Sequence, residues 1–310
     1  MIKYTDRHYR YMMRLITKKT MLYTEMITAN AIIHGRGKNL LKYSSVENPL
    51  ALQLGGNNPR DLSFCAKLAE DLDYSEVNLN VGCPSDRVSR GDFGLSLMYN
   101  PELVAECVHS LKQTVDIPIS VKCRIGVDHK DSFEELVYFI KSIIDSNVDF
   151  ICLHARKGWL NGLSPKENRT IPRLQYDTIY QIKKLFPKQL IGINGGITTF
   201  DEIKVHLSHV DSVMIGREAY HNPMLFKDVD QLFYNEIIRG LTPFDVAEAL
   251  IPYIEEELKS PDCKLSHITR HTLQLFNGYP NSRVYRRFLS QKATSSNAGV
   301  ETFKEALSYL

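Results

Sequence analysis

Cys83 is the side chain in this sequence whose setting best suits catalysis. It lies in Asn80-Val81-Gly82-Cys83-Pro84-Ser85, at the end of a β-rich run. Gly82 and Pro84 predict a rigid turn, and a thiol held there could act as a nucleophile or as a general acid. No separate His–Asp pairing accompanies it, so triad chemistry is not supported. The cysteines at 65, 107, 123 and 152 are expected to be small buried hydrophobes.

Two glycine-containing segments predict a phosphate site. Asn194-Gly195-Gly196 and Gly216-Arg217 each end or follow a β-rich run, and the two runs are consecutive. Glycine lets backbone N–H groups approach an anion, and arginine adds a charge-assisted contact. Loops after the last two strands of a barrel commonly bind phosphate. We therefore expect a phosphorylated cofactor at these segments.

Three further polar residues, Gln53, Lys122 and His154, lie at or next to the ends of β-rich runs. Their side chains can donate hydrogen bonds to a polar, partly anionic ring system. The isoalloxazine of a flavin has such an edge, and a nearby cation stabilises reduced flavin. No group of His, Cys and acidic residues has the spacing of metal ligands, so the sequence predicts no metal site.

Alternating strands and helices must position these residues. Seven β-rich runs alternate with amphipathic segments between residues 20 and 220, which predicts a parallel sheet. Seven repeats without an obvious topological switch point favour a (β/α)₈ TIM barrel over an open sheet. The polar residues at the run ends would then converge on its C-terminal rim. The runs are Met21–Met26, Pro49–Leu54, Val77–Gly82, Pro118–Arg124, Phe150–Ala155, Leu190–Asn194 and Ser212–Gly216.

Helix signals separate these runs. Asn58-Pro59 and Asn100-Pro101 each combine an N-cap residue with a first-turn proline, predicting helices over Pro59–Leu72 and Pro101–Val115. A third helix is predicted over Asp131–Ile144. Its expected core face consists of Phe133, Leu136, Val137, Ile140 and Ile144.

The two ends of the chain differ from this pattern. Met1–Thr17 predicts a loop and a helix, so the first barrel strand is expected to be truncated or missing. A seven-stranded barrel cannot close unless something fills the gap. After Asn222-Pro223 the pattern becomes helical, and Thr242-Pro243 predicts a helix start. We expect a barrel domain over residues 1–235 and a small helical domain over residues 241–310.

Composition excludes several classes of protein. The 310 residues are 43% apolar and 24% charged, values typical of a globular chain rather than a disordered one or a small disulfide scaffold. No segment approaches the ~20 apolar residues of a membrane span, and the charged N-terminus is unlike a signal peptide. We expect a cytoplasmic monomer with no membrane partner, whose six cysteines are reduced.

Positive charge is concentrated in two stretches, although the net charge is only +2. Arg156–Arg173 holds five basic residues and one acid, and Lys264–Lys292 holds six basic residues and no acid. Between them, Asp245–Asp262 holds six acids and one lysine. Two such basic stretches in a nearly neutral chain favour a phosphate-binding surface, as on a nucleic-acid partner.

Over nearly its whole length the chain resembles the tRNA-dihydrouridine synthases, and their A-type subfamily in particular. The cysteine segment Asn78–Ser85 is typical of the family, and Gly162–Arg169 (Gly-Leu-Ser-Pro-Lys-Glu-Asn-Arg) is typical of the subfamily. The other matching segments are Tyr23–Met26, Leu52–Gly56, Val121–Gly126, His154–Lys157, Asn194–Gly196 and Gly216–Glu218.

The resemblance implies a flavoenzyme that reduces uridine to 5,6-dihydrouridine in the D-loop of tRNA, at positions 20 and 20a. NADPH would reduce FMN, hydride would pass from FMN N5 to uracil C6, and Cys83 would protonate C5. The implied FMN contacts are Met1, Gln53, Lys122, His154, Asn194, Gly195, Gly196, Gly216 and Arg217. The implied tRNA contacts are Asn80 on the uracil, Glu167 and Arg169 in a loop, and Arg283, Arg286 and Arg287 in the helical domain.

The resemblance departs at the N-terminus, where the family's first strand ends in Ala-Pro-Met. Here only Met1 of that strand precedes Thr5-Asp6-Arg7. Either the chain starts too far downstream, or Met1 keeps its FMN contact in a less rigid setting. Two other functions remain open: an FMN barrel acting on a free pyrimidine, similar to dihydroorotate dehydrogenase, and a non-catalytic RNA-binding protein with a degenerate barrel.

Overall fold

Two compact units make up the chain in the computed structural model, which describes residues 1–35, 37–85, 88, 91–237 and 240–310. One unit comprises Met1–Leu22, Tyr43–Pro49 and Arg217–Leu310, and the other comprises Tyr23–Lys42 and Leu50–Gly216. The first helix of the chain thus belongs to the same unit as the C-terminal helices. Domains bounded at residues 235 and 241 remain a prediction.

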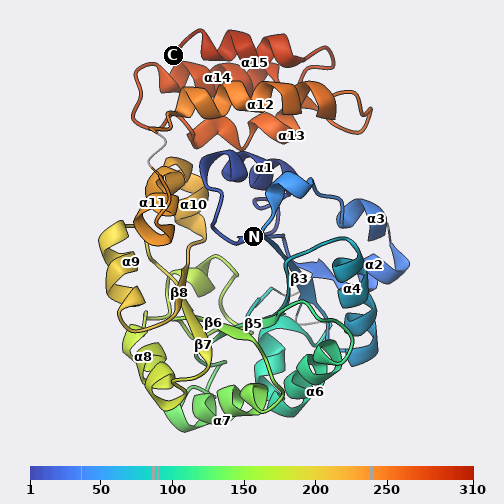
Figure 1. Ribbon diagram of the computed structural model, residues 1–310, viewed down its shortest axis with the longest axis vertical. Helices are drawn as coiled ribbons and strands as arrows, with labels where there is room; N and C mark the ends of the chain where they lie inside the picture. The colour runs from blue at the N-terminus through green and yellow to red at the C-terminus, as the bar shows by residue number, and fades with distance from the viewer. Residues whose placement is uncertain (36, 86–87, 89–90, 238–239) are drawn as a thin grey trace. The chain divides into compact units, whose positions relative to one another are not determined.

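A parallel β-sheet forms the centre of the second unit, with helices around it (Figure 1). Its strand order is β1-β3-β4-β5-β6-β7-β8, with β2 paired to β3, and each described register is parallel. The two ends of that order, β1 and β8, are not paired with each other within the described residues. The strands are β1 Leu22–Tyr23, β2 Ile27–Thr28, β3 Leu50–Gly55, β4 Glu76–Val81, β5 Ile119–Arg124, β6 Phe150–His154, β7 Leu190–Asn194 and β8 Ser212–Met214.

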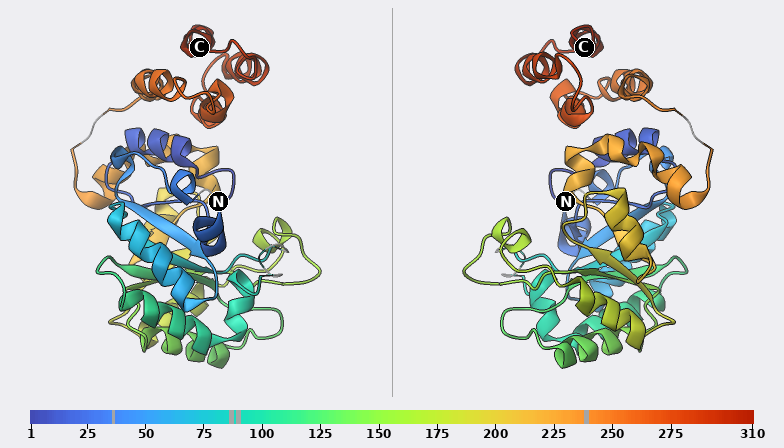
Figure 2. Two further views of the ribbon diagram at one scale, coloured as in Figure 1. Left: turned by 90° about the vertical axis from the view of Figure 1, so that its right-hand side faces the viewer. Right: turned by 90° about the vertical axis from the view of Figure 1, so that its left-hand side faces the viewer.

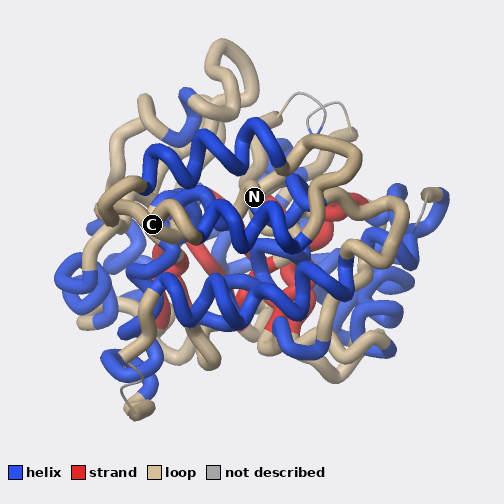
Figure 3. The backbone as a smooth tube through the Cα atoms, turned by 90° about the horizontal axis from the view of Figure 1, so that it is seen from above, coloured by secondary structure: helices blue, strands red, loops and turns tan. Residues whose placement is uncertain are grey.

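All seven predicted strands are present, and the sequence analysis missed one, the two-residue β2. Within the described residues the sheet is open between β8 and β1, and the truncated or missing first barrel strand stays a prediction. Figure 3 marks the strands in red, the helices in blue and the loops in tan. The α/β barrel-like fold is therefore confirmed, as a curled sheet that is not closed.

Alternation along β4 separates a packing face from a polar face. Val77, Leu79 and Val81 are fully buried, and they alternate with the polar residues Glu76, Asn78 and Asn80. Helices cover the outside of the sheet (Figure 2), and the aliphatic side chains of β4 pack against them. The polar set therefore lines the concave side. The surrounding helices are α2 Ala29–His34, α3 Gly37–Leu40, α4 Pro59–Asp71, α6 Pro101–Lys112, α7 Phe133–Ile144, α8 Tyr176–Leu185 and α9 Phe200–Leu207.

Helix caps follow the sequence closely. The side chains of Asn58 and Asn100 accept hydrogen bonds from backbone N–H groups of α4 and α6, as predicted. Ser132 caps α7 with a capping box to Glu135. The predicted core face of α7 was partly wrong, because its buried residues are Leu136, Phe139, Ile140 and Ile143, whereas Phe133, Val137 and Ile144 are half-buried.

The first unit is helical apart from Leu22. Thr242 caps α12 in a capping box with Asp245, which confirms the predicted helix start. The described residues after Met214 contain no strand, in agreement with the helical pattern. No helix in the described ranges is long and apolar enough to cross a membrane. The helices are α1 Arg7–Ile16, α10 Arg217–His221, α11 Val229–Tyr234, α12 Pro243–Glu257, α13 Leu265–Thr269, α14 Ser282–Lys292 and α15 Val300–Leu307.

Arg14 of α1 fixes the chain segments that surround it. Its guanidinium, 2% exposed, donates to the carbonyl oxygens of Glu47, Thr17, Thr20 and Pro49 at 2.8–3.1 Å. Burial lowers the pKa of this guanidinium to about 10, so it stays charged at neutral pH. These bonds tie α1 to the turn after it and to the segment that precedes β3.

Arg14→Met should therefore destabilise the protein, because methionine removes the donor from the buried carbonyl groups of Glu47 and Thr17 and from the part-buried carbonyl groups of Thr20 and Pro49. We expect the free energy of unfolding to fall by about 3 kcal/mol. Denaturant titration measures this change. Arg60→Met, at an exposed position of α4, is the control and should change the value by less than about 0.5 kcal/mol. Equal effects of the two substitutions would contradict the role of Arg14.

Candidate active site

Cys83 lies in a turn that hydrogen bonds hold on both sides. The side-chain Oδ1 of Asn80 accepts from the backbone N–H groups of Gly82 at 3.2 Å and Cys83 at 3.0 Å. The Cys83 carbonyl accepts from Leu95 N at 3.0 Å. Gly94 has a φ of 67°, and a Cβ there would lie 2.8 Å from the Cys83 carbonyl oxygen. These contacts hold the Cys83 backbone on both sides, in agreement with the predicted turn.

Cys83 differs from the barrel's other cysteines in exposure. Cys65, Cys107, Cys123 and Cys152 are buried, as predicted, whereas Cys83 is half-buried. Burial raises the pKa of the Cys152 thiol to about 11 and those of Cys65 and Cys107 to about 12. These thiols stay protonated and enclosed, so Cys83 is the thiol of the sheet unit that a substrate can reach.

Lys122 on β5 lies beside Asn80 on β4, because the two residues are register partners in the sheet. It is half-buried, and burial lowers the pKa of its amine. Within the described residues its amine forms no hydrogen bond and no ion pair. A cation partly withdrawn from water and lacking a partner is suited to an anionic or electron-rich ligand.

The β6 and β7 ends bring His154, Asn194 and two glycines together. Asn194 Nδ2 donates to the Met214 carbonyl at 2.7 Å and so joins β7 to β8. Gly195 and Gly196 have φ angles of 123° and 75°, which side-chain-bearing residues rarely adopt. A Cβ on Gly195 would lie 3.3 Å from the His154 ring. Leu174 and Tyr176 also lie close to these glycines, so a side chain at either position would collide with them, and glycine is what this corner requires.

Asn80 has less capacity for a substrate than the resemblance implies. Its Oδ1 already accepts two backbone N–H groups, and its Nδ2 donates to Gln53 Oε1 at 2.8 Å. Gln53 is 8% exposed and Asn80 is 9% exposed. One amide N–H of Asn80 therefore remains for a ligand, and its oxygen is committed to the cysteine turn.

The loop after β6 contains the predicted tRNA contacts Glu167 and Arg169, which are exposed on a 3₁₀ turn. Asn168 between them is fully buried and bonds to Trp159 at both N–H and carbonyl, with distances of 2.7 and 2.9 Å. Arg124 donates to the carbonyl groups of Gly82, Lys157 and Asn168 at 2.9–3.1 Å. The cysteine turn and this loop therefore share one guanidinium.

Part of the basic stretch Arg156–Arg173 is engaged within the protein. Lys157 pairs with Asp131 at 2.6 Å and lies 4.6 Å from the centre of the Trp159 ring. Arg156 donates to the carbonyl groups of Thr170 and Pro172. These two charges therefore interact with their own loop, and a phosphate-binding surface over Arg156–Arg173 remains a prediction.

Residues of the first unit complete the predicted set. Met1 is half-buried and its amino group donates to Thr5 Oγ1 at 2.8 Å, and Arg217 is exposed at the start of α10, directly after Gly216. Arg283, Arg286 and Arg287 lie on α14, where Tyr285 and Leu289 are the buried side chains. Arg283 and Arg287 are exposed, and Arg286 donates to Asn277 at 3.2 Å. The roles of these five residues toward ligands remain predictions.

Comparison with known proteins decides the family. The family described as dihydrouridine synthase matches residues 1–309. A Synechocystis protein named tRNA-dihydrouridine(20/20a) synthase is 52% identical over 307 residues, 99% of this chain and 92% of that protein. Proteins of the same name from Shewanella oneidensis and Escherichia coli K12 are 53% and 50% identical across 99% of this chain and 91% and 89% of their own lengths. The chain belongs to the dihydrouridine synthase family.

A solved structure supports the fold of this chain. The complex of 2-naphthoyl-CoA reductase with 2-naphthoyl-CoA has a TM-score of 0.56 at 12% identity. The match covers 75% of this chain and 48% of that chain. At this identity the likeness concerns the fold alone, and it agrees with the parallel sheet described above.

Sequence reasoning missed two residues that shape the candidate site, Arg124 and Asn168. Arg124 could have been found, because it continues the inward alternation of Ser120 and Lys122 along β5. Asn168 lies inside the subfamily segment, but nothing local indicated that its side chain would be buried. Both residues form contacts between loops, which a strand or helix pattern does not encode.

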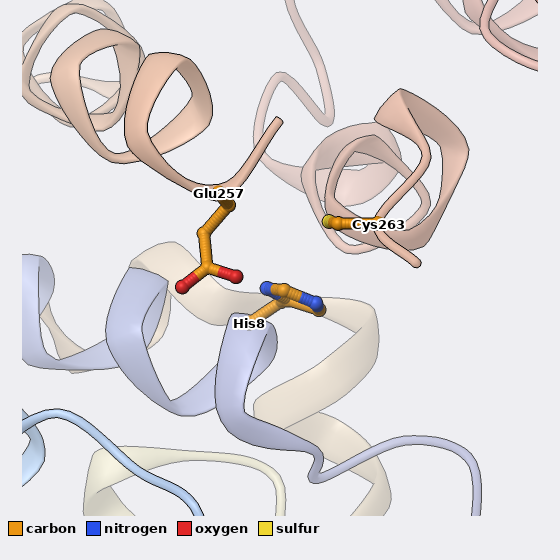
Figure 4. A group of neighbouring side chains, drawn as sticks. All are labelled: His8, Glu257 and Cys263. Atoms are coloured by element: carbon orange, nitrogen blue, oxygen red, sulfur yellow. The ribbon is translucent and has the colours of Figure 1, made fainter. Parts of the chain in front are cut away.

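A group of possible metal ligands meets in the first unit, where the sequence predicted no metal site. Ligand atoms of His8, Glu257 and Cys263 lie within 4.8 Å of one another (Figure 4). Both oxygens of Glu257 accept from the Arg7 guanidinium, and His8 Nδ1 bonds to Tyr253 OH at 2.8 Å. A metal ion would have to displace that guanidinium, so we assign the group to packing between α1 and α12.

Proposed function

We propose that this chain reduces uridine to 5,6-dihydrouridine in the D-loop of tRNA. The relatives' shared name, tRNA-dihydrouridine(20/20a) synthase, supports positions 20 and 20a as the targets. The observation that carries the proposal is the half-buried Cys83 thiol, whose backbone N–H donates to Asn80. Asn80 is the register partner of Lys122, whose amine has no hydrogen-bond or ion-pair partner among the described residues. We also propose a cytoplasmic monomer, because its tRNA substrate is there and no second copy is needed to supply these residues.

FMN is the cofactor that the residues of the sheet unit fit. Lys122 on β5 offers a cation to the electron-rich ring. Gln53 on β3 and His154 on β6 lie toward the C-terminal ends of their strands, as Lys122 does. Gly195 and Gly196 offer backbone N–H groups without side-chain bulk for the phosphate, and Gly216 with Arg217 would add to that site. FMN, when bound, supplies the hydride that reduces the C5–C6 bond, and NADPH is the proposed reductant.

The protein's own part in the reaction is to hold the uracil and to deliver a proton. Cys83 Sγ would give its proton to uracil C5 as a general acid. Asn80 fixes the turn that carries this thiol and keeps one N–H for the base. A base stacked in the D-loop cannot reach a thiol at the concave side of the sheet, so the target uridine must be splayed out of the loop. Glu167 and Arg169 would contact tRNA beside the pocket.

The two alternative functions are tested directly. A colourless purified protein without flavin absorbance, also after incubation with FMN, would favour an RNA-binding protein over an enzyme. Turnover of free uracil or orotate, with none on a tRNA transcript, would favour a free-pyrimidine enzyme. The proposed function requires the opposite result in both assays: bound flavin, and activity that depends on tRNA.

The three arginines of α14 lead to a prediction about salt. Arg283, Arg286 and Arg287 have i, i+3 and i+4 spacing on one helix, and no acid lies between Lys264 and Lys292. If they contact phosphates, replacing all three by alanine should flatten the slope of log K against log salt by roughly two to three units, at ~0.7–0.9 per contact. tRNA affinity measured at several salt concentrations tests this.

A matched control uses three exposed lysines on the outer helices α7, α8 and α9. Replacing Lys141, Lys184 and Lys204 by alanine removes the same charge but should leave the slope unchanged. Parallel lines for the wild type and the arginine triple variant would show that these arginines touch no phosphate. The tRNA surface would then be confined to the loop after β6.

A further inference from the structure

A single line of hydrogen bonds runs through the concave side of the sheet, from its N-terminal end to the cysteine turn. Cys83 N donates to Asn80 Oδ1, Asn80 Nδ2 to Gln53 Oε1, and Gln53 Nε2 to Asn78 Oδ1, with distances of 3.0, 2.8 and 2.8 Å. Asn78 Nδ2 then donates to Ser120 Oγ at 2.7 Å. Ser120 donates to Glu76 Oε1, which also accepts from Tyr23 OH at 3.1 Å.

Every donor in this line points away from Cys83 and toward Glu76. One end is a backbone N–H, which can only donate, and the other is a carboxyl oxygen that accepts twice. The three amides between them could each be turned by 180°, but only one orientation lets every member both donate and accept. Asn78 and Ser120 are fully buried, so a break in the line would leave a polar group unsatisfied.

Glu76 can end the line in either protonation state. Burial raises the pKa of its carboxyl group. When the carboxyl is protonated on its other oxygen, Oε1 is a carbonyl oxygen and still accepts from Ser120 and Tyr23. The direction of the line therefore does not depend on the charge of Glu76.

We infer that Glu76, Ser120 and Asn78 are positioning residues that fix which way the Gln53 and Asn80 amides face. This role rests on the proposed function, since it concerns the two amides beside the flavin and the uracil. Asn80 Oδ1 accepts two hydrogen bonds and Gln53 Oε1 accepts one, and each amide has one N–H left within the described residues. Each therefore presents a donor, and its ligand must present an acceptor such as a ring carbonyl. A pyrimidine with an amino group in place of that ring carbonyl would put its N–H donor against the N–H donor of the amide.

Three substitutions at the base of the line test this inference. Glu76→Gln keeps an acceptor oxygen of the same size and should retain kcat/KM within about twofold. Glu76→Met keeps the volume but removes the acceptor, and should lower kcat/KM on tRNA by about 10-fold. Asn78→Leu cuts the line above Ser120 and should lower kcat/KM at least as much. A role of Glu76 in charge alone would make Gln as harmful as Met, and a space-filling role would make Met harmless.

A double substitution shows whether Glu76 acts through Asn78. Once Asn78→Leu has cut the line, adding Glu76→Met should change kcat/KM by no more than about twofold. Multiplied effects of the two substitutions would mean that they act separately, which would overturn the inference. Glu106→Gln and Glu106→Met, made at an exposed position of the outer helix α6, are the matched controls for the two Glu76 substitutions and should leave kcat/KM unchanged.

The rate of Cys83 alkylation gives a readout that does not need turnover. In a Cys263→Ser background, Cys83 is the remaining cysteine that is not buried. Glu76→Met and Asn78→Leu should make its reaction with iodoacetamide several-fold faster, because a turned Asn80 amide releases the Gly82 and Cys83 N–H groups. An unchanged rate in both, with thermal melting showing folded protein, would overturn the inference. Failure of the proposed function instead appears as an inactive wild type.

Discussion

Cys83→Ala should nearly abolish dihydrouridine formation, with a loss of about 10²–10⁴-fold, the usual contribution of a positioned acid. The expected loss follows from the turn, in which Asn80 and Gly94 hold the backbone of Cys83 and leave its thiol half-buried. Alanine removes the proton donor without disturbing those backbone contacts. Single-turnover assays on a tRNA transcript measure the loss, and flavin content and flavin reduction by NADPH should stay normal.

The control for this prediction is Cys263→Ala, which removes the other half-buried thiol and lies in the first unit. It should leave the rate of dihydrouridine formation unchanged. Full turnover by Cys83→Ala would show that the thiol is not the proton donor and that another group at the strand ends supplies the proton.

Lys122→Met should yield protein that has lost most of its flavin. The methionine preserves much of the side-chain volume, so the loss would come from the cation rather than from packing. The amine is half-buried and has no partner among the described residues, which leaves it available to an electron-rich ring. Flavin absorbance per mole of purified protein measures the effect.

Lys141→Met is the matched control for the flavin measurement. Lys141 is exposed on α7 and pairs with Asp145 at the surface, where such pairs contribute little. Its variant should hold as much FMN as the wild type. If Lys122→Met also holds a full complement of FMN, the cofactor does not bind at the β5 end and the assignment of the flavin site is wrong.

The strands and helix starts could be predicted because their causes are local. Asn58 and Asn100 precede prolines, so their caps can be read from adjacent residues. The core face of α7 could not be read as safely, because apolar residues cover two neighbouring stripes and the packing against other elements selects Phe139 and Ile143. The strand β2 is only two residues long and depends on β3 for its pairing.

The candidate site also contains residues that the sequence predicts locally and contacts that it does not predict. Cys83 and Lys122 were predicted because glycine, proline and strand alternation mark them locally. The line from Glu76 to Asn80 depends on the register of three strands, which no single segment encodes. The meeting of His8 with Glu257 and Cys263 joins residues about 250 positions apart, so the spacing rule for metal ligands could not anticipate it.

A dihydrouridine map of tRNA tests the central claim most directly. The map is made from cells that lack this gene and carry either the wild-type chain or Cys83→Ala on a plasmid. We expect dihydrouridine at positions 20 and 20a to disappear in the deletion, to return with the wild type, and to stay absent with Cys83→Ala. Unchanged dihydrouridine at both positions in the deleted cells would contradict the account.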